Sequence, residues 1–134
     1  MWMDKERMKF EDNTALTLLI EKIKAIPDVL AIVVFGSYAV GNTKEMSDID
    51  IAVIVAKADK HIEADIGSMY SPKFDVVLFH RLPLHIQYEV LKNGNVIFCR
   101  NEEHFLEITR NVLREYLEMS DMYERIKRRV LVCD

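Results

Sequence analysis

Four apolar runs of strand length divide the sequence and predict a small mixed β-sheet. The first of them is apolar on both faces, which is typical of a strand in the centre of a sheet. Polar segments rich in turn-forming residues separate the runs. The predicted strands are 29–35, 49–55, 74–79 and 96–99.

Helical spacing of apolar residues links these strands. Leu16, Leu19 and Ile23 define a helix that Pro27 ends. A weaker helix is predicted over 59–69, and another begins at Pro83. We therefore expect an α/β fold in which the helices pack mainly on one face of the sheet.

The last third of the chain carries one long apolar stripe with steps of three and four residues. If it forms one helix of about 27 residues, that helix extends roughly 40 Å, which is longer than a small domain requires. Either the stripe packs across its own sheet, or part of it covers a partner in a homo- or hetero-oligomer. The stripe consists of Phe105, Ile108, Val112, Tyr116, Met119, Tyr123, Ile126 and Val130.

Length and composition suit one domain over residues 1–134, with a core at about 14–100 and a helical segment at about 103–132. The formal net charge of -4 disfavours direct nucleic-acid binding, which needs a basic footprint. Cys99 and Cys133 have no metal-ligand spacing. The N-terminus lacks the apolar core of a signal peptide, and no run is long enough to span a membrane. We expect a cytoplasmic protein.

Two carboxylates open the second predicted strand. Asp48 and Asp50 are two residues apart, so on a strand they share one face. Two like charges on an apolar strand are costly unless a cation lies between them. Oxygen ligands of this kind favour Mg²⁺ or Mn²⁺. The alternative is a surface turn or helix cap.

The first strand leads into a Gly-Ser pair. Ser37 is placed to begin a short helix, whose free N–H groups attract phosphate, and Gly36 permits a close approach to the backbone. An ordinary turn would read the same. Asp75 is a third lone acid in an apolar strand. If its strand lies beside 49–55, three carboxylates converge on one metal site, which suggests phosphoryl or nucleotidyl transfer.

Gly36-Ser37, ten residues and then Asp48-Ile49-Asp50 resemble the signature of the DNA polymerase beta-type nucleotidyltransferase superfamily. The small size and Ser47 before the acids resemble its minimal nucleotidyltransferase (MNT) antitoxin branch. The resemblance covers roughly residues 14–100 and maps the family's third acid to Asp75. One departure is Val40, where close relatives often carry Arg, which puts nucleotide affinity in doubt.

The resemblance implies a Mg²⁺-dependent protein adenylyltransferase that moves AMP from ATP to a tyrosine of a HEPN ribonuclease toxin encoded by an adjacent gene. In that case Asp48, Asp50 and Asp75 would be the catalytic metal ligands, with two Mg²⁺ ions. Gly36, Ser37 and Ser47 would contact the nucleotide. Two alternatives remain, a small-molecule nucleotidyltransferase and an antitoxin that acts by binding alone.

His80 and Arg81 directly follow the Asp75 strand. They either lie near the mouth of the site, where they could contact a phosphate, or form a polar turn between strand and helix.

Overall fold

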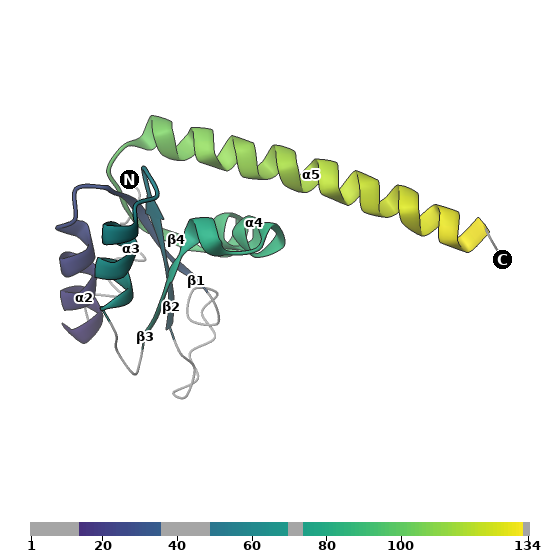
Figure 1. The fold of residues 1–134 in the computed structure, drawn as a ribbon. Coiled ribbons are helices and arrows are strands. Elements are labelled where there is room, and N and C mark those ends of the chain that lie inside the picture. Colours follow the sequence, from purple (N-terminus) through teal and green to yellow (C-terminus); the bar gives the residue numbers. More distant parts are fainter. Residues whose placement is uncertain (1–13, 36–48, 70–73, 133–134) are drawn as a thin grey trace.

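The computed structural model describes residues 14–35, 49–69 and 74–132. Its four strands form one sheet in the order β3-β2-β1-β4, with β2 parallel to β3 and β1 antiparallel to both of its neighbours (Figure 1). Each predicted strand is confirmed, and each boundary lies within one residue of its predicted place. The strands are β1 (Val29–Phe35), β2 (Ile49–Val55), β3 (Phe74–Leu78) and β4 (Asn95–Cys99).

The helices are α2 (Thr14–Lys24), α3 (Lys60–Gly67), α4 (Leu84–Asn93) and α5 (Glu102–Val132), with a 3-10 turn, η1, at Phe79–Arg81. Local chemistry explains two of their starts. The Asp59 carboxylate accepts the His61 backbone N–H at 2.7 Å and so caps α3. Pro83 immediately precedes α4, a position that needs no N–H.

The helices cover both faces of the sheet, so the expectation of helices mainly on one face was wrong. Helices α2 and α3 pack on one face, and α4 and α5 pack on the other (Figure 1). The physical reason lies in β1 and β2, which are buried along almost their whole length. Because successive side chains alternate between the faces, a single helical layer would leave half of these apolar side chains in water.

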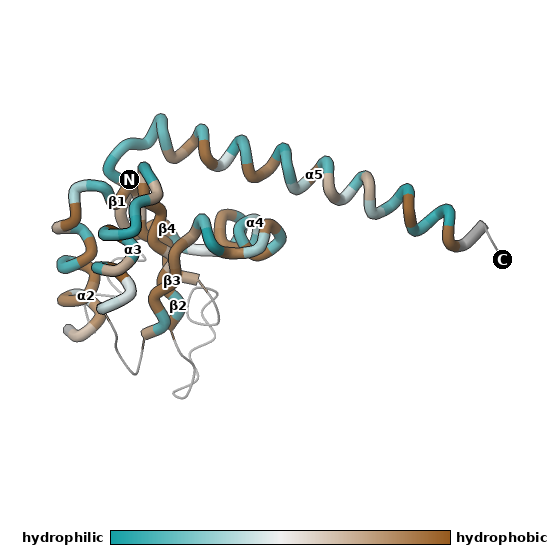
Figure 2. Tube along the Cα trace, in the orientation of Figure 1, coloured by the Kyte–Doolittle hydropathy of each residue, from teal (hydrophilic) through white to brown (hydrophobic). Residues whose placement is uncertain are grey.

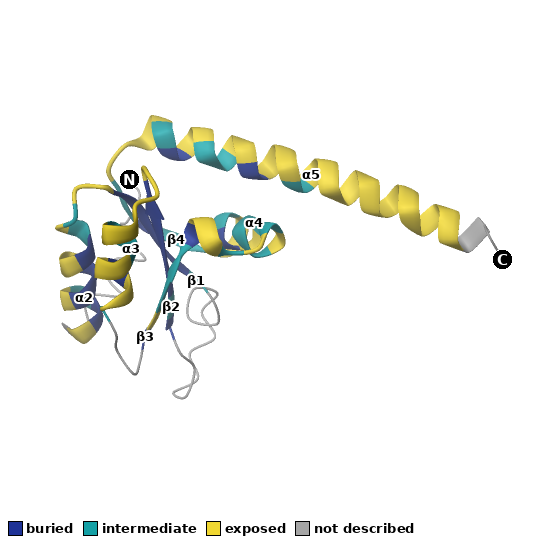
Figure 3. Ribbon diagram, viewed as in Figure 1, coloured by how far each residue is buried: buried dark blue, intermediate teal, exposed yellow. Residues whose placement is uncertain are grey.

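Helix α5 is one continuous helix of 31 residues, about 46 Å long. Phe105 and Val112 are buried against the sheet, whereas every residue from 117 to 130 is exposed (Figure 3). The first interpretation of the C-terminal stripe is therefore confirmed for the first half of α5, whereas a partner on the second half stays a prediction. Its first half covers its own domain, and its second half is uncovered. None of the helices in the described ranges combines the length and the apolar character that a membrane span requires.

Candidate active site

Strand directions bring the two described acids of the predicted site together. Because β1 runs opposite to β2 and β3, the end of β1 meets the beginnings of the other two strands. Phe35 is in register with Asp50, and Asp50 is in register with Asp75. Adjacent strands are about 4.8 Å apart, so the two carboxylates originate from neighbouring backbone positions.

Both acids lie on the face of the sheet that α4 and α5 cover. Ile49 and Ile51 belong to the core under α2 and α3, so Asp50 between them lies on the opposite face. The same alternation applies to Asp75, because Phe74 and Val76 pack into the α2/α3 core. Asp50 is half-buried and Asp75 is exposed, so the pair lies where the protein meets solvent.

The donor chemistry of this pair fits a hard divalent cation. Two carboxylates in register repel each other, and a shared cation would remove that cost. The described residues contain no cluster of three or more His, Cys, Asp or Glu side chains that could hold a metal. The structure thus brings together two of the three predicted ligands.

The remaining predicted site residues lie outside the described ranges. They are Gly36, Ser37, Ser47 and Asp48, together with Val40, the departure from the family pattern. Their roles stay predictions, as do the roles of Asp50 and Asp75.

His80 and Arg81 lie at the other end of the sheet, so the hypothesis that they line the mouth of the site was wrong. They follow the C-terminal end of β3, and Asp75 lies at its beginning. Arg81 Nε donates to Glu63 of α3 at 2.5 Å, and His80 Nε2 lies 3.5 Å from the same carboxylate. The hydrogen bond from Arg81 lowers the pKa of Glu63. The polar-turn alternative is therefore the correct one.

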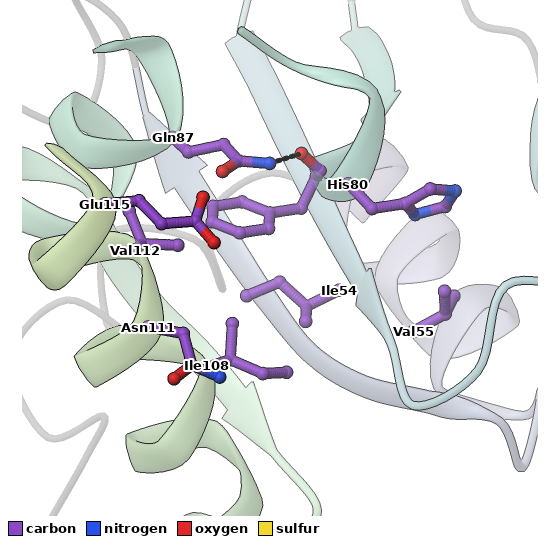
Figure 4. Close-up of a pocket in the computed structure, with 9 residues that line it drawn as sticks. Ile54, Val55, His80, Gln87, Ile108, Asn111, Val112 and Glu115 are labelled. Carbon is purple, nitrogen blue, oxygen red and sulfur yellow. Dashed lines mark hydrogen bonds between the residues drawn. The ribbon is translucent and has the colours of Figure 1, made fainter. Parts of the chain in front are cut away.

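A pocket of about 310 Å³ opens at this same far end, between β2, η1, α4 and α5 (Figure 4). Ile54, Phe79 and Val112 give it an apolar lining, and Gln87 Nε2 donates to the Phe79 carbonyl at 3.0 Å. No pattern in the sequence predicted this pocket. Its lining comes from four separate elements, and nothing in the local sequence marks their convergence.

Gly94 holds α4 close to β1 near the end that carries the acids. A Cβ atom at this position would lie 2.4 Å from the Val90 carbonyl oxygen and 2.5 Å from Cγ1 of Val33. Val33 and Val34 directly precede Phe35, the register partner of Asp50. The missing side chain of Gly94 therefore allows the close packing of α4 beside this end of the sheet.

An edge where β1 ends beside two in-register acids, on a four-stranded mixed sheet, defines a nucleotidyltransferase-type α/β domain. The family profile described as "Polymerase beta, Nucleotidyltransferase" matches residues 18–103, and the chain belongs to this family. The chain is also 34% identical over 102 residues to "Putative protein adenylyltransferase MJ1547" of Methanocaldococcus jannaschii. That alignment covers 74% of this chain and 76% of the relative.

Solved structures share the fold. One chain from a toxin-antitoxin structure with AMP-PNP superimposes with a TM-score of 0.64 at 23% identity, covering 85% of this chain and 97% of that chain. A second match is to a structure of tri-AMPylated Shewanella oneidensis HEPN toxin in complex with MNT antitoxin. Its TM-score is 0.61 at 20% identity, with coverage of 87% and 93%. These likenesses show the fold.

Proposed function

We propose that this chain is an MNT-type antitoxin that transfers AMP from ATP to a tyrosine of a partner HEPN ribonuclease toxin and thereby neutralises it. The observation that carries the proposal is the register of Asp50 with Asp75 beside the end of β1. The relative named as a protein adenylyltransferase supports the same reaction, and the toxin-antitoxin structures support the same kind of partner.

In this proposal Asp48, Asp50 and Asp75 hold two Mg²⁺ ions, with Mn²⁺ as a substitute. When bound, such a metal pair stabilises the attacking and leaving oxygens of an in-line displacement. Gly36, Ser37 and Ser47 bind the nucleotide phosphates. All of these contacts act on the triphosphate, so the acceptor must reach the edge from outside.

The tyrosine oxygen forms a bond to the α-phosphorus of ATP, and the bond from that phosphorus to the bridging oxygen breaks. Pyrophosphate leaves with the electron pair. The phenolic proton leaves toward Asp75, which is exposed at the edge, whereas Asp50 is half-buried. An exposed acid at this position also leaves room for a protein acceptor.

The test is label transfer. The purified chain is incubated with Mg²⁺, ATP labelled at the α-phosphate and the HEPN protein encoded by the adjacent gene. An Asp48→Ala/Asp50→Ala double variant runs beside it, with Asp65→Asn as the matched control. Asp65 is an exposed carboxylate on α3, away from the two acids.

We expect label on the HEPN protein with the wild type and with Asp65→Asn, and none with the double variant. Tight binding without label from any form would overturn the enzymatic proposal and favour an antitoxin that acts by binding alone. Label on a small-molecule acceptor instead would favour the other alternative.

A further inference from the structure

The apolar stripe of α5 continues beyond the part of the helix that covers the sheet. Seven residues make almost two whole turns, so residues seven apart lie nearly in line along a helix. Met119 and Ile126 therefore continue the line of the buried Phe105 and Val112. In the same way, Tyr123 continues the line of Tyr116, and Val130 follows it. Figure 2 shows apolar segments recurring along α5 almost to its end.

We call the part of α5 from Leu117 to Val130 the overhang. Its large apolar side chains are well exposed, with 59% of Tyr123 and 64% of Val130 accessible to solvent. A single exposed apolar residue is ordinary, but a stripe of them along one helix indicates an interaction surface.

The direction of the stripe shows what kind of occupant it suits. Because it continues the line that packs on the sheet in the first half of α5, it faces the same side as the α4/α5 face of the domain. Asp50 and Asp75 lie on that face. A molecule seated along the overhang therefore lies on the face of the sheet that carries Asp50 and Asp75, although α5 itself contacts the opposite end of that face, at Ile54 and Phe79.

The charge of the overhang also restricts the kind of partner that it suits. Arg125, Lys127, Arg128 and Arg129 follow one another at the end of the overhang, in a chain whose formal net charge is -4. Only Arg125 has an ion-pair partner among the described residues, Asp121 at 3.5 Å within the same helix. Glu118, Asp121 and Glu124 share the overhang, so its basic charge is confined to the end, where it suits an apolar ridge with acidic residues beside it.

We propose that the overhang is the docking surface for the acceptor protein, which presents a helix with an apolar stripe and acidic flanks. This inference rests on the proposed function and extends it, since it assigns the surface that delivers the tyrosine. A second copy of this chain is the competing occupant of the stripe, and it would be seen as a dimer.

The experiment compares Tyr123→Glu/Ile126→Glu with wild type and with Leu18→Glu. Leu18 lies on α2 and is 60% exposed, so it matches Tyr123 in exposure but lies off the stripe. Affinity for the HEPN protein and label transfer are measured for all three forms, together with AMP-PNP binding as a check on the site. A second variant, Met119→Glu/Val130→Glu, guards against a fault specific to the first.

Both overhang variants should bind the HEPN protein roughly tenfold more weakly or worse and label it correspondingly less at low concentration, with unchanged AMP-PNP binding. Leu18→Glu should match wild type. Unchanged affinity and labelling in both overhang variants would overturn the docking surface and leave the proposed function standing. A wild type that neither binds nor labels the HEPN protein would overturn both. A wild-type dimer that only the overhang variants dissolve would assign the stripe to a second copy.

Discussion

The acidic side chains at the two ends of the sheet have different surroundings. At the end where β3 finishes, Glu63 is held by Arg81 at 2.5 Å and faces His80 at 3.5 Å. At the other end, Asp50 and Asp75 are in register as two like charges. Asp75 is exposed at this end.

Glu63 therefore has a structural role, whereas Asp50 and Asp75 have a proposed role in the reaction. Glu63 has a cationic partner, Arg81, within the fold, and this pair contributes a modest amount to stability at neutral pH. Asp50 and Asp75 are like charges at neighbouring backbone positions, and a bound cation would offset the cost of bringing them together. The ion pair of Glu63 with Arg81 and the pair of proposed metal ligands, Asp50 and Asp75, thus lie at opposite ends of β3, about one strand length apart.

The largest expected effect concerns the end away from the acids. Phe79→Ala removes a buried ring that packs between the sheet, α4 and α5, and should lower the free energy of unfolding by about 3–5 kcal/mol. Urea denaturation measures it. His85→Ala, at an exposed position on α4, is the control and should change little. A loss below about 1 kcal/mol for Phe79→Ala would show that this end is not a stability centre.

Asp75→Asn should lower activity without lowering stability, in contrast to Phe79→Ala. It should slow label transfer about 100-fold, equivalent to roughly 2.7 kcal/mol of transition-state stabilisation. The thermal midpoint should stay level or rise, because one of two repelling charges is gone. Label transfer and thermal unfolding are measured on the same preparation. A variant that is fully active, or inactive only because it unfolds, would contradict the distinction between the two ends.

Gly94→Ala tests the packing beside the acids. The added Cβ would meet the Val90 carbonyl and Val33 far inside contact distance, so we expect a loss of about 1–3 kcal/mol. Gly67→Ala is the matched control, because no atom lies within 4 Å of its Cβ position and alanine favours a helix. In chemical denaturation the midpoint of Gly94→Ala should fall and that of Gly67→Ala should rise. Equal midpoints would mean that α4 shifts away without cost.

The smallest effect is a pH dependence at the charge-paired end. The hydrogen bond from Arg81 lowers the pKa of Glu63 below the ordinary value of 4.5. A lowered folded-state pKa contributes stability that is present above 4.5 and is lost as the pH falls through the folded value. Arg81→Ala should therefore be less stable than wild type at neutral pH, and the two should converge in acid.

Unfolding midpoints across pH 3–7 measure this convergence. Arg125→Ala, which breaks the exposed pair with Asp121, is the control and should run parallel to wild type. If the midpoints of Arg81→Ala also ran parallel to those of wild type, the ion pair between Arg81 and Glu63 would not contribute to stability.

Much of the fold could be predicted from the sequence because its signals are local. The uninterrupted apolar run of β1 and the regular stripe of α5 each specify one element without reference to another. The two-sided helical cover was also implicit in β1, since a strand apolar on both faces must be covered on both. The expectation of helices on one face overlooked that requirement.

The place of His80 and Arg81 depended on strand direction, which is not a local signal. Once Asp50 and Asp75 are assumed to converge from the beginnings of two strands, those strands must be parallel, and whatever follows Asp75's strand lies at the far end. The pocket beside Phe79 had no such indirect signal, because its lining comes from four separate elements.

The parallel pairing of β2 with β3 also has a kinetic meaning. Asp50 and Asp75 are 25 residues apart in the chain and become neighbours only when the crossover through α3 closes. Closing such a loop costs entropy before any strand contact offsets it, so non-local parallel pairing forms slowly during folding. We therefore expect a newly made chain to pair β1 with β2 before it brings the two acids together. The carboxylate site is then a property of the completed fold, and we expect partly folded chains to lack it.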